Sequence, residues 1–125
     1  MIFGQQIHQK INDHRLSNQL NTLVFQPLLF KEARSHSLRM AKSKSVTDAG
    51  LDAVFDDLRS KIGGTDAGFI LDINQYAVAD SIMKELLSDA DINQLSLGTY
   101  TQAGVGVAAD ADKINYITIL FLNIP

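Results

Sequence analysis

The end of the chain constrains the fold most strongly, because the hydrophobic period there changes from that of helices to that of strands. Two β-rich runs, Ala103–Ala109 and Ile114–Leu122, are joined by the four polar or small residues Asp110–Lys113. Two such runs around a short polar turn are typical of a β-hairpin. We therefore predict that the chain ends in two antiparallel strands.

Most of the chain before these runs carries apolar residues at helical spacing, which predicts four helices. Pro27 suits the first turn of a helix, where its missing N–H needs no partner. We expect Thr47 or Asp48 to cap the third helix and Gly63-Gly64 to end it. The predicted helices are Gln5–Asn18, Pro27–Lys42, a third that contains Leu51–Ile62, and Gln75–Ser88, with an apolar link at Leu23–Phe25, a brief extended segment at Phe69–Leu71 and a loop at Asp89–Thr99 that includes a helical turn at Ile92–Leu95.

The length and composition indicate one α+β domain over residues 1–125, large enough to form a core without disulfides. The chain has no cysteine, which excludes thiol catalysis, zinc–thiolate sites and iron–sulfur clusters. The net charge is −3 and the basic residues are scattered, which argues against nucleic acid as a partner. The longest apolar run is too short for a transmembrane segment.

The first residues, Met1–Gln6, lack the basic region and the long apolar region of a signal peptide. Two interpretations remain open at this point. Either the protein is cytoplasmic, or an export signal has been removed from the chain.

Three segments have the order and spacing of one family's motifs. They are Asn12-Asp13-His14-Arg15 with Ala33, His36-Ser37 and Met40-Ala41; Asp48-Ala49-Gly50-Leu51; and Ser88–Val107, which keeps Ser88, Tyr100 and Gly104-Val105-Gly106-Val107. Ile114–Phe121 is similar to the family's closing strand. The chain thus resembles the CAP superfamily (cysteine-rich secretory, antigen 5 and pathogenesis-related proteins) in its bacterial, SCP-like form. The resemblance implies a three-layer α–β–α sandwich around a small antiparallel sheet.

The resemblance also implies a cleft in which family members place two histidines and two acidic residues, where some bind a divalent ion. In this chain the histidine positions fall on Asp48 and Asp91, one glutamate position falls on Phe69, and a family tryptophan falls on Glu85. Because zinc favours imidazole nitrogen, we expect that this metal-binding tetrad is lost and that no metal or other cofactor is bound.

The role of the remaining candidates stays open. Asp48 and Asp91 could face each other across the cleft, either as ligands of a hard cation such as calcium, which normally takes six or more oxygens, or as an acid/base pair. Alternatively, Asp48 caps a helix and Asp91 is a solvated loop residue. His36 lies on the apolar stripe of its helix, so a hydrogen-bonded core residue is the simpler interpretation. Ser88 lacks a nucleophile elbow, and Gly104-Val105-Gly106 lacks the third glycine and following helix of a phosphate loop.

Three functions follow from these residues. The first is a non-catalytic binding module for a small apolar ligand, a glycan or an envelope partner, with a candidate cleft at His36, Asp48, Phe69 and Asp91. The alternatives are a hydrolase that uses Asp48 and Asp91 with His36, and a self-associating domain that pairs through the edge of the terminal hairpin. The resemblance also implies a secreted or cell-envelope protein.

Overall fold

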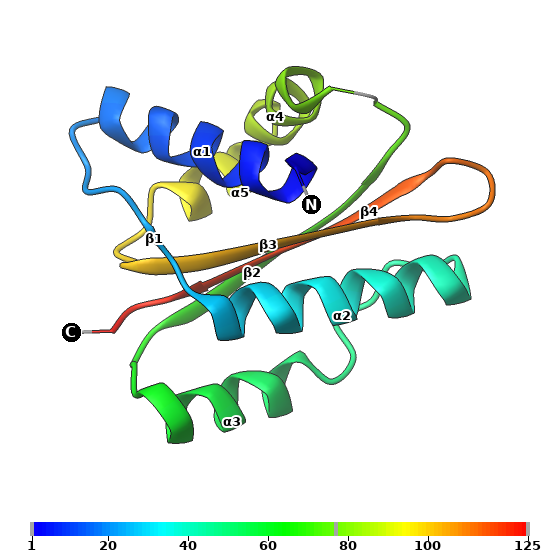
Figure 1. The fold of residues 1–125 in the computed structure, drawn as a ribbon. Coiled ribbons are helices and arrows are strands. Elements are labelled where there is room, and N and C mark those ends of the chain that lie inside the picture. Colours follow the sequence, from blue (N-terminus) through cyan, green and yellow to red (C-terminus); the bar gives the residue numbers. More distant parts are fainter. Residues whose placement is uncertain (1, 77, 125) are drawn as a thin grey trace.

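Helices cover both faces of a four-stranded sheet in the computed structural model, which describes residues 2–76 and 78–124 (Figure 1). Helices α1, α4 and α5 lie on one face, and α2 and α3 lie on the other. The predicted three-layer α+β sandwich is therefore confirmed. The elements are α1 (Ile2–Ser17), β1 (Val24–Phe25), α2 (Pro27–Ser43), α3 (Leu51–Ile62), β2 (Ala67–Asn74), α4 (Ala79–Ser88), α5 (Ala90–Ser96), β3 (Gln102–Ala109) and β4 (Asn115–Leu122).

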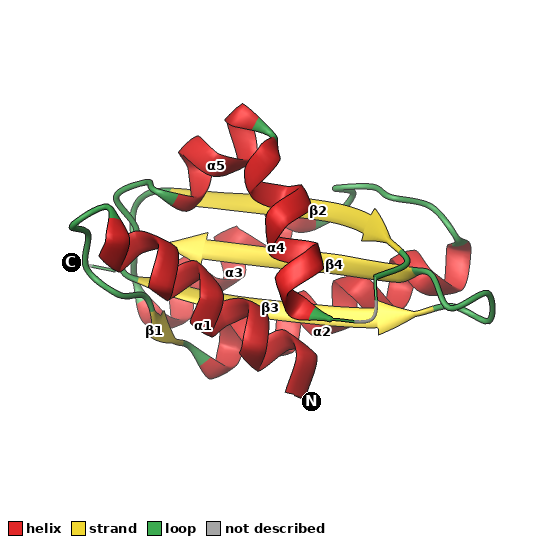
Figure 2. Cartoon of the chain, turned by 90° about the horizontal axis from the view of Figure 1, so that it is seen from above, coloured by secondary structure: helices red, strands yellow, loops and turns green. Residues whose placement is uncertain are grey.

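The sheet has the strand order β1-β3-β4-β2 (Figure 2). The predicted hairpin is confirmed, since β3 and β4 pair antiparallel along their whole length. The predicted apolar link at residues 23–25 contains the short strand β1, which runs parallel to β3. The extended segment predicted at residues 69–71 is the centre of an eight-residue strand, β2, which pairs antiparallel with β4. The last strand in sequence is therefore internal, and β2 forms an edge.

Strand β4 is internal because it is apolar on both faces. Ile117, Ile119 and Phe121 belong to the core cluster shared with α1 and α4. Leu120 and Leu122 belong to the cluster shared with α2 and α3. A strand covered by helices on both sides needs apolar side chains at consecutive positions rather than at alternate ones.

Helix α2 packs unusually close to β3 because glycines replace side chains at the contact. A Cβ atom added at Gly104 would lie 2.2 Å from the backbone nitrogen of Phe30, and one at Gly106 would lie 2.3 Å from the carbonyl carbon of Ala33. The hydroxyl of Ser37 also donates to the Gly106 carbonyl at 3.0 Å. The prediction that these glycines belong to a packed strand is confirmed.

Several predicted boundaries are wrong. Helix α3 begins after Gly50, which has a left-handed conformation and no side-chain cap, so neither Thr47 nor Asp48 caps it. The predicted helix over residues 75–88 begins only at Ala79, and Ala77 lies outside the described residues.

The loop predicted over residues 89–99 contains a complete short helix, α5, rather than a single turn. Its cap is Asp89, whose carboxylate Oδ1 accepts from the N–H groups of Asp91 and Ile92 at 2.9 and 3.1 Å. An acidic side chain that pairs with the free N–H groups of the first turn stabilises a helix start. Across the described ranges, no helix combines the length and apolar character that crossing a bilayer requires.

Candidate functional site

His36 lies on α2 and is 1% exposed. Its Nε2 lies 2.6 Å from the carbonyl oxygen of Thr47, and its Nδ1 lies 3.3 Å from Nη2 of Arg39. A carbonyl only accepts and a guanidinium only donates, so Nε2 carries the proton and Nδ1 is the acceptor. Both ring nitrogens are therefore engaged: Nε2 holds the loop after α2, and Nδ1 pairs with Arg39 on the same helix.

Asp48 and Asp91 lie in different layers of the sandwich. Asp48 is exposed in the loop that connects α2 to α3, the two helices below the sheet in Figure 1, while Asp91 is exposed in the first turn of α5, a helix above it. The carbonyl of Asp48 accepts from the N–H of Leu51 at 3.1 Å, which closes the turn into α3. The structure does not bring the two carboxylates together.

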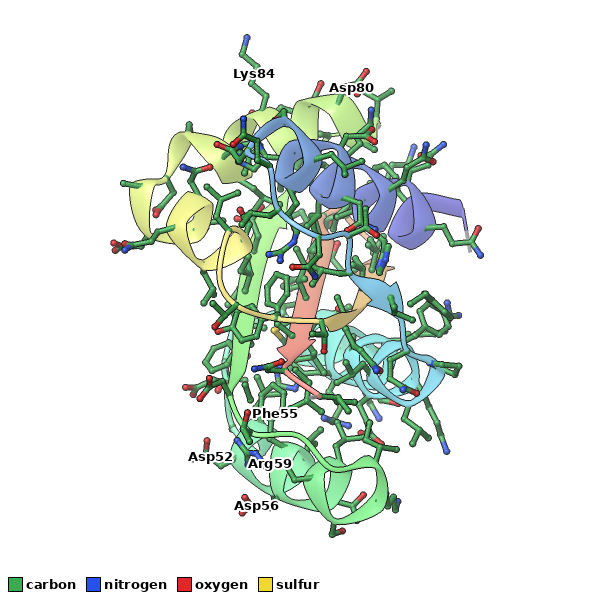
Figure 3. The ribbon with its side chains drawn as sticks, turned by 90° about the vertical axis from the view of Figure 1, so that its left-hand side faces the viewer. Asp52, Phe55, Asp56, Arg59, Asp80 and Lys84 are labelled. Atoms are coloured by element: carbon green, nitrogen blue, oxygen red, sulfur yellow. The ribbon has the colours of Figure 1, made fainter. Side chains whose placement is uncertain are left out.

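Phe69 lies on β2 and packs half-buried against the cluster shared by α2 and α3. Its ring lines an open groove of about 330 Å³ between β2 and α3, here called the α3 groove. Figure 3 shows Asp52, Asp56 and Arg59 grouped on one side of α3. The α3 groove is lined by Asp52, Phe55, Asp56, Arg59, Ala67 and Phe69. Of the four predicted site residues, Phe69 is the one that lines this groove.

Arg15 has a structural role that the sequence analysis did not identify. Its side chain is fully buried, and it donates to the carbonyls of Asn21, Ser96 and Gly98 at 2.8, 3.0 and 2.8 Å, and to that of Tyr100 at 3.3 Å. The guanidinium therefore holds the segment between α5 and β3 against α1. The Asn12-x-x-Arg15 motif was the available signal, because a motif arginine at a core-facing helix position needs several acceptors.

The other two histidines make structural contacts. His8 Nε2 lies 3.0 Å from the carbonyl oxygen of Leu23, and His14 Nε2 lies 2.7 Å from Oδ1 of Asn93 on α5. Burial lowers the pKa of His8, and the bond to Leu23 partly opposes this shift. All three histidines thus connect helices to neighbouring segments.

Glu85 differs from the other acidic residues in its surroundings. Its Oε2 is buried without a hydrogen-bond partner among the described residues. Burial and the neighbouring charge of Asp72 raise the pKa of the Glu85 carboxyl. The sequence analysis noted this position only as a replaced tryptophan.

The donor set does not fit the divalent ion that the family implies. Within residues 2–76 and 78–124, no three His, Cys, Asp or Glu side chains are grouped so that they could hold a metal ion. Asp48 and Asp91 are in separate layers, Phe69 supplies no donor atom, and His36 has no free nitrogen.

A sequence model described as "CAP: Cysteine-rich secretory protein family" matches residues 8–121. No curated protein matches the chain. Among solved structures, an outer surface protein from Borrelia burgdorferi has a TM-score of 0.86 at 14% identity, with 100% of this chain and 95% of that chain covered.

Two further similar structures come from other bacteria. An extracellular protein containing a SCP domain from Bacillus anthracis has a TM-score of 0.81 at 22% identity, over 98% of this chain and 40% of that one. A cysteine-rich secretory protein from Staphylococcus aureus has a TM-score of 0.81 at 15% identity, over 98% of this chain and 38% of that one. These likenesses show the fold, and the family match over residues 8–121 shows that this cysteine-free chain belongs to the CAP family.

Proposed function

We propose that this chain is a non-catalytic binding domain of the CAP fold. The observation that supports the proposal is that the candidate catalytic residues lie apart from one another or are already engaged in hydrogen bonds. Asp48 and Asp91 are exposed in separate layers, and both nitrogens of His36 are engaged in hydrogen bonds. A fold does not by itself supply a reaction, so the surface is the better candidate for function.

The proposal includes the loss of the family's metal tetrad. Two separated, exposed carboxylates bind a divalent ion weakly, because calcium takes six or more oxygens and structural zinc takes four ligands. Isothermal titration of the purified protein with ZnCl₂ and with CaCl₂ tests this point. We expect no stoichiometric binding, and tight one-to-one uptake of either ion would contradict the proposal.

The ligand classes that we propose are a small apolar molecule, a glycan or a partner of the cell envelope. The names of the similar structures support the last of these, since one is an outer surface protein and another is extracellular. We accordingly propose that this chain also acts outside the cytoplasm. Binding assays against sterols, fatty acids, peptidoglycan and solubilised envelope proteins test the function, and uniformly absent binding would overturn it.

Two alternative functions have direct tests. A hydrolase would need Asp48 and Asp91 to act together, so the double substitution Asp48→Asn with Asp91→Asn would abolish any hydrolysis that the protein shows. Self-association has one supporting observation, the unpaired outer edge of a sheet strand. The terminal hairpin offers such an edge on β3, which among the described residues pairs with β1 only at Gln102 and Ala103, and β2 offers a second edge on the other side of the sheet.

A further inference from the structure

The outer edge of β2 is available for another strand. Its one sheet neighbour is β4, and β2 is the terminal strand of the four. Along such an edge, every second residue directs its N–H and C=O away from the sheet, where an extended peptide can pair with them. The strand has eight residues, Ala67–Asn74, which is long enough to hold a short peptide in register.

The α3 groove lies along one side of this edge and combines an apolar base with negative charge. Phe55 and Phe69 supply apolar surface, and Asp52 and Asp56 supply carboxylates (Figure 3). Arg59 pairs with Asp56 at 3.2 Å and donates to the Thr65 carbonyl at 3.1 Å. The Asp52 carboxylate has no ion-pair partner within the described chain. Such a groove suits a lysine or arginine, whose aliphatic stem packs on apolar surface while its charged end meets a carboxylate.

Acidic residues also flank the other side of β2. Asp72 lies on the strand and accepts from the side-chain amide of Asn74 at 3.1 Å. Glu85 lies on α4 within electrostatic range of Asp72, and its Oε2 is buried without a hydrogen-bond partner among the described residues. Successive side chains of an added strand point to opposite faces. A basic residue on either face of that strand would therefore approach a carboxylate.

The distribution of charged residues indicates which kind of strand would pair with the β2 edge. Helix α2, in the layer below the sheet, carries Lys31, Arg34, Arg39 and Lys42, whereas Asp52, Asp72 and Glu85 flank the β2 edge without a basic partner in the described residues. A second copy paired edge to edge would bring like charges together, which is unfavourable for cross-strand neighbours. A basic extended segment would instead gain opposite charges along the same edge.

We infer that the outer edge of β2 adds an extended, lysine- or arginine-rich segment of a partner protein as a further strand of the sheet. This inference rests on the proposed binding function and names the partner class and the surface. The backbone of β2 would supply affinity, and the α3 groove with Asp72 and Glu85 would supply the preference for basic side chains.

Three labelled nine-residue peptides test the inference by fluorescence anisotropy at low salt. The first alternates threonine and lysine, the second replaces each lysine by glutamate, and the third keeps all lysines but places proline at the central threonine. Proline cannot donate to a strand ladder, so the third peptide separates strand addition from simple charge attraction. We expect the threonine–lysine peptide to bind about tenfold more tightly than the proline peptide, which loses hydrogen bonds of the strand ladder. The glutamate peptide should not bind, because its charges have the same sign as those of the β2 edge.

Protein variants locate the binding surface. Asp52→Asn with Asp56→Asn should weaken binding of the threonine–lysine peptide about tenfold, because it removes the unpaired carboxylate of Asp52 and frees the Arg59 cation from its ion pair with Asp56. The matched control is Asp57→Asn, which removes a charge on the same helix that already pairs with Lys61 at 2.8 Å. It should change the affinity by less than about twofold. Amide hydrogen exchange along residues 67–74 should slow when the peptide is bound.

Three results would overturn the inference: no binding of the threonine–lysine peptide, equal binding of the proline peptide, or unchanged affinity in the double variant. The failure of this inference is distinguishable from that of the proposed function. If the threonine–lysine peptide does not bind but a sterol, a fatty acid, peptidoglycan or an envelope protein does, only the inference about the β2 edge is wrong. If none of these probes binds, the proposed function is wrong as well.

Discussion

Arg15 shows how a single buried cation can organise a connection between layers. Its guanidinium is enclosed and pairs with no carboxylate of residues 2–76 and 78–124, and backbone carbonyls from two separate segments accept from its N–H groups. Burial lowers the pKa of Arg15. A buried charge persists in a protein when hydrogen bonds compensate for its lost hydration. The segment that leads into β3 is therefore held by a side chain of α1.

The first prediction concerns this residue. Arg15→Met should destabilise the protein by about 3 kcal/mol, because it leaves several buried carbonyls without donors. Urea unfolding followed by circular dichroism measures the change. Arg34→Met is the matched control, since Arg34 is exposed and should change stability by less than about 0.5 kcal/mol. Similar stabilities for the two variants would contradict the role assigned to Arg15.

His8 predicts a pH effect with a definite sign. Burial lowers its pKa in the folded state below the ordinary value of 6.5, so between the two values the unfolded chain binds more protons. The stability that His8 contributes is fully present above the unfolded pKa and is lost as the pH falls through the folded pKa. His8→Gln should therefore reduce the loss of stability on acidification below 6.5, measured by urea unfolding at several pH values. An unchanged pH dependence would show that another group controls it.

At the scale of elements, the contact between α2 and β3 depends on the absence of side chains at two positions. Gly104→Ala and Gly106→Ala would each place a methyl group within about 2.3 Å of the α2 backbone, which cannot rotate away. Each should destabilise the protein by about 3 kcal/mol through overpacking. Val107→Ala on the same strand should cost about 1 kcal/mol as an ordinary loss of packing. Thermal unfolding of the three variants checks the ranking.

Elements were predicted well where a local signal was strong. Pro27 begins α2 and Gly63 follows the end of α3, because both residues act through their own backbone restrictions. The start of α3 was predicted wrongly, because Thr47 and Asp48 are good capping residues but lie too early. The N–H of Ala49 bonds to Thr47 Oγ1, and the helix begins only after Gly50. Helix α5 was predicted as a single turn because its short apolar pattern covers little more than that.

For the whole molecule, we propose that residues 1–125 form one domain. The two helical layers share the same sheet, and β4 contributes to the core on both of its faces. We predict a single unfolding transition, because unfolding of the shared sheet would expose the apolar faces of both helical layers. Far-ultraviolet circular dichroism and tyrosine fluorescence should give the same midpoint in urea. Two separated midpoints would mean that the layers unfold independently.

The charge distribution of the whole molecule gives a further prediction. Acidic residues around the β2 edge should disfavour pairing between copies. We therefore expect a monomer by light scattering over a wide range of protein concentration at low salt. A dimer in which amide hydrogen exchange slows along residues 67–74 would instead support self-association through β2.

The candidate site was predictable only in part. The sequence order identified His36, Asp48, Phe69 and Asp91 as the positions to inspect, because a family motif fixes where residues fall along the chain. It could not reveal that the sandwich separates Asp48 from Asp91, since the layer of each helix depends on packing between distant segments. The α3 groove was not predicted, because its lining residues come from both α3 and β2, and neither segment contains a sequence motif typical of a binding site.

The sequence alone determined the helix-to-strand order, the terminal hairpin and the family, because hydrophobic period, turn residues and motif spacing are properties of neighbouring residues. The tertiary structure alone decided which strand is an edge, which carboxylates share a surface and which polar atoms lack a partner. Those properties depend on contacts such as β2 with β4 and Arg15 with the segment before β3. Such contacts join residues that are distant in sequence, and they form only when the apolar side chains of the whole chain are buried together in one fold.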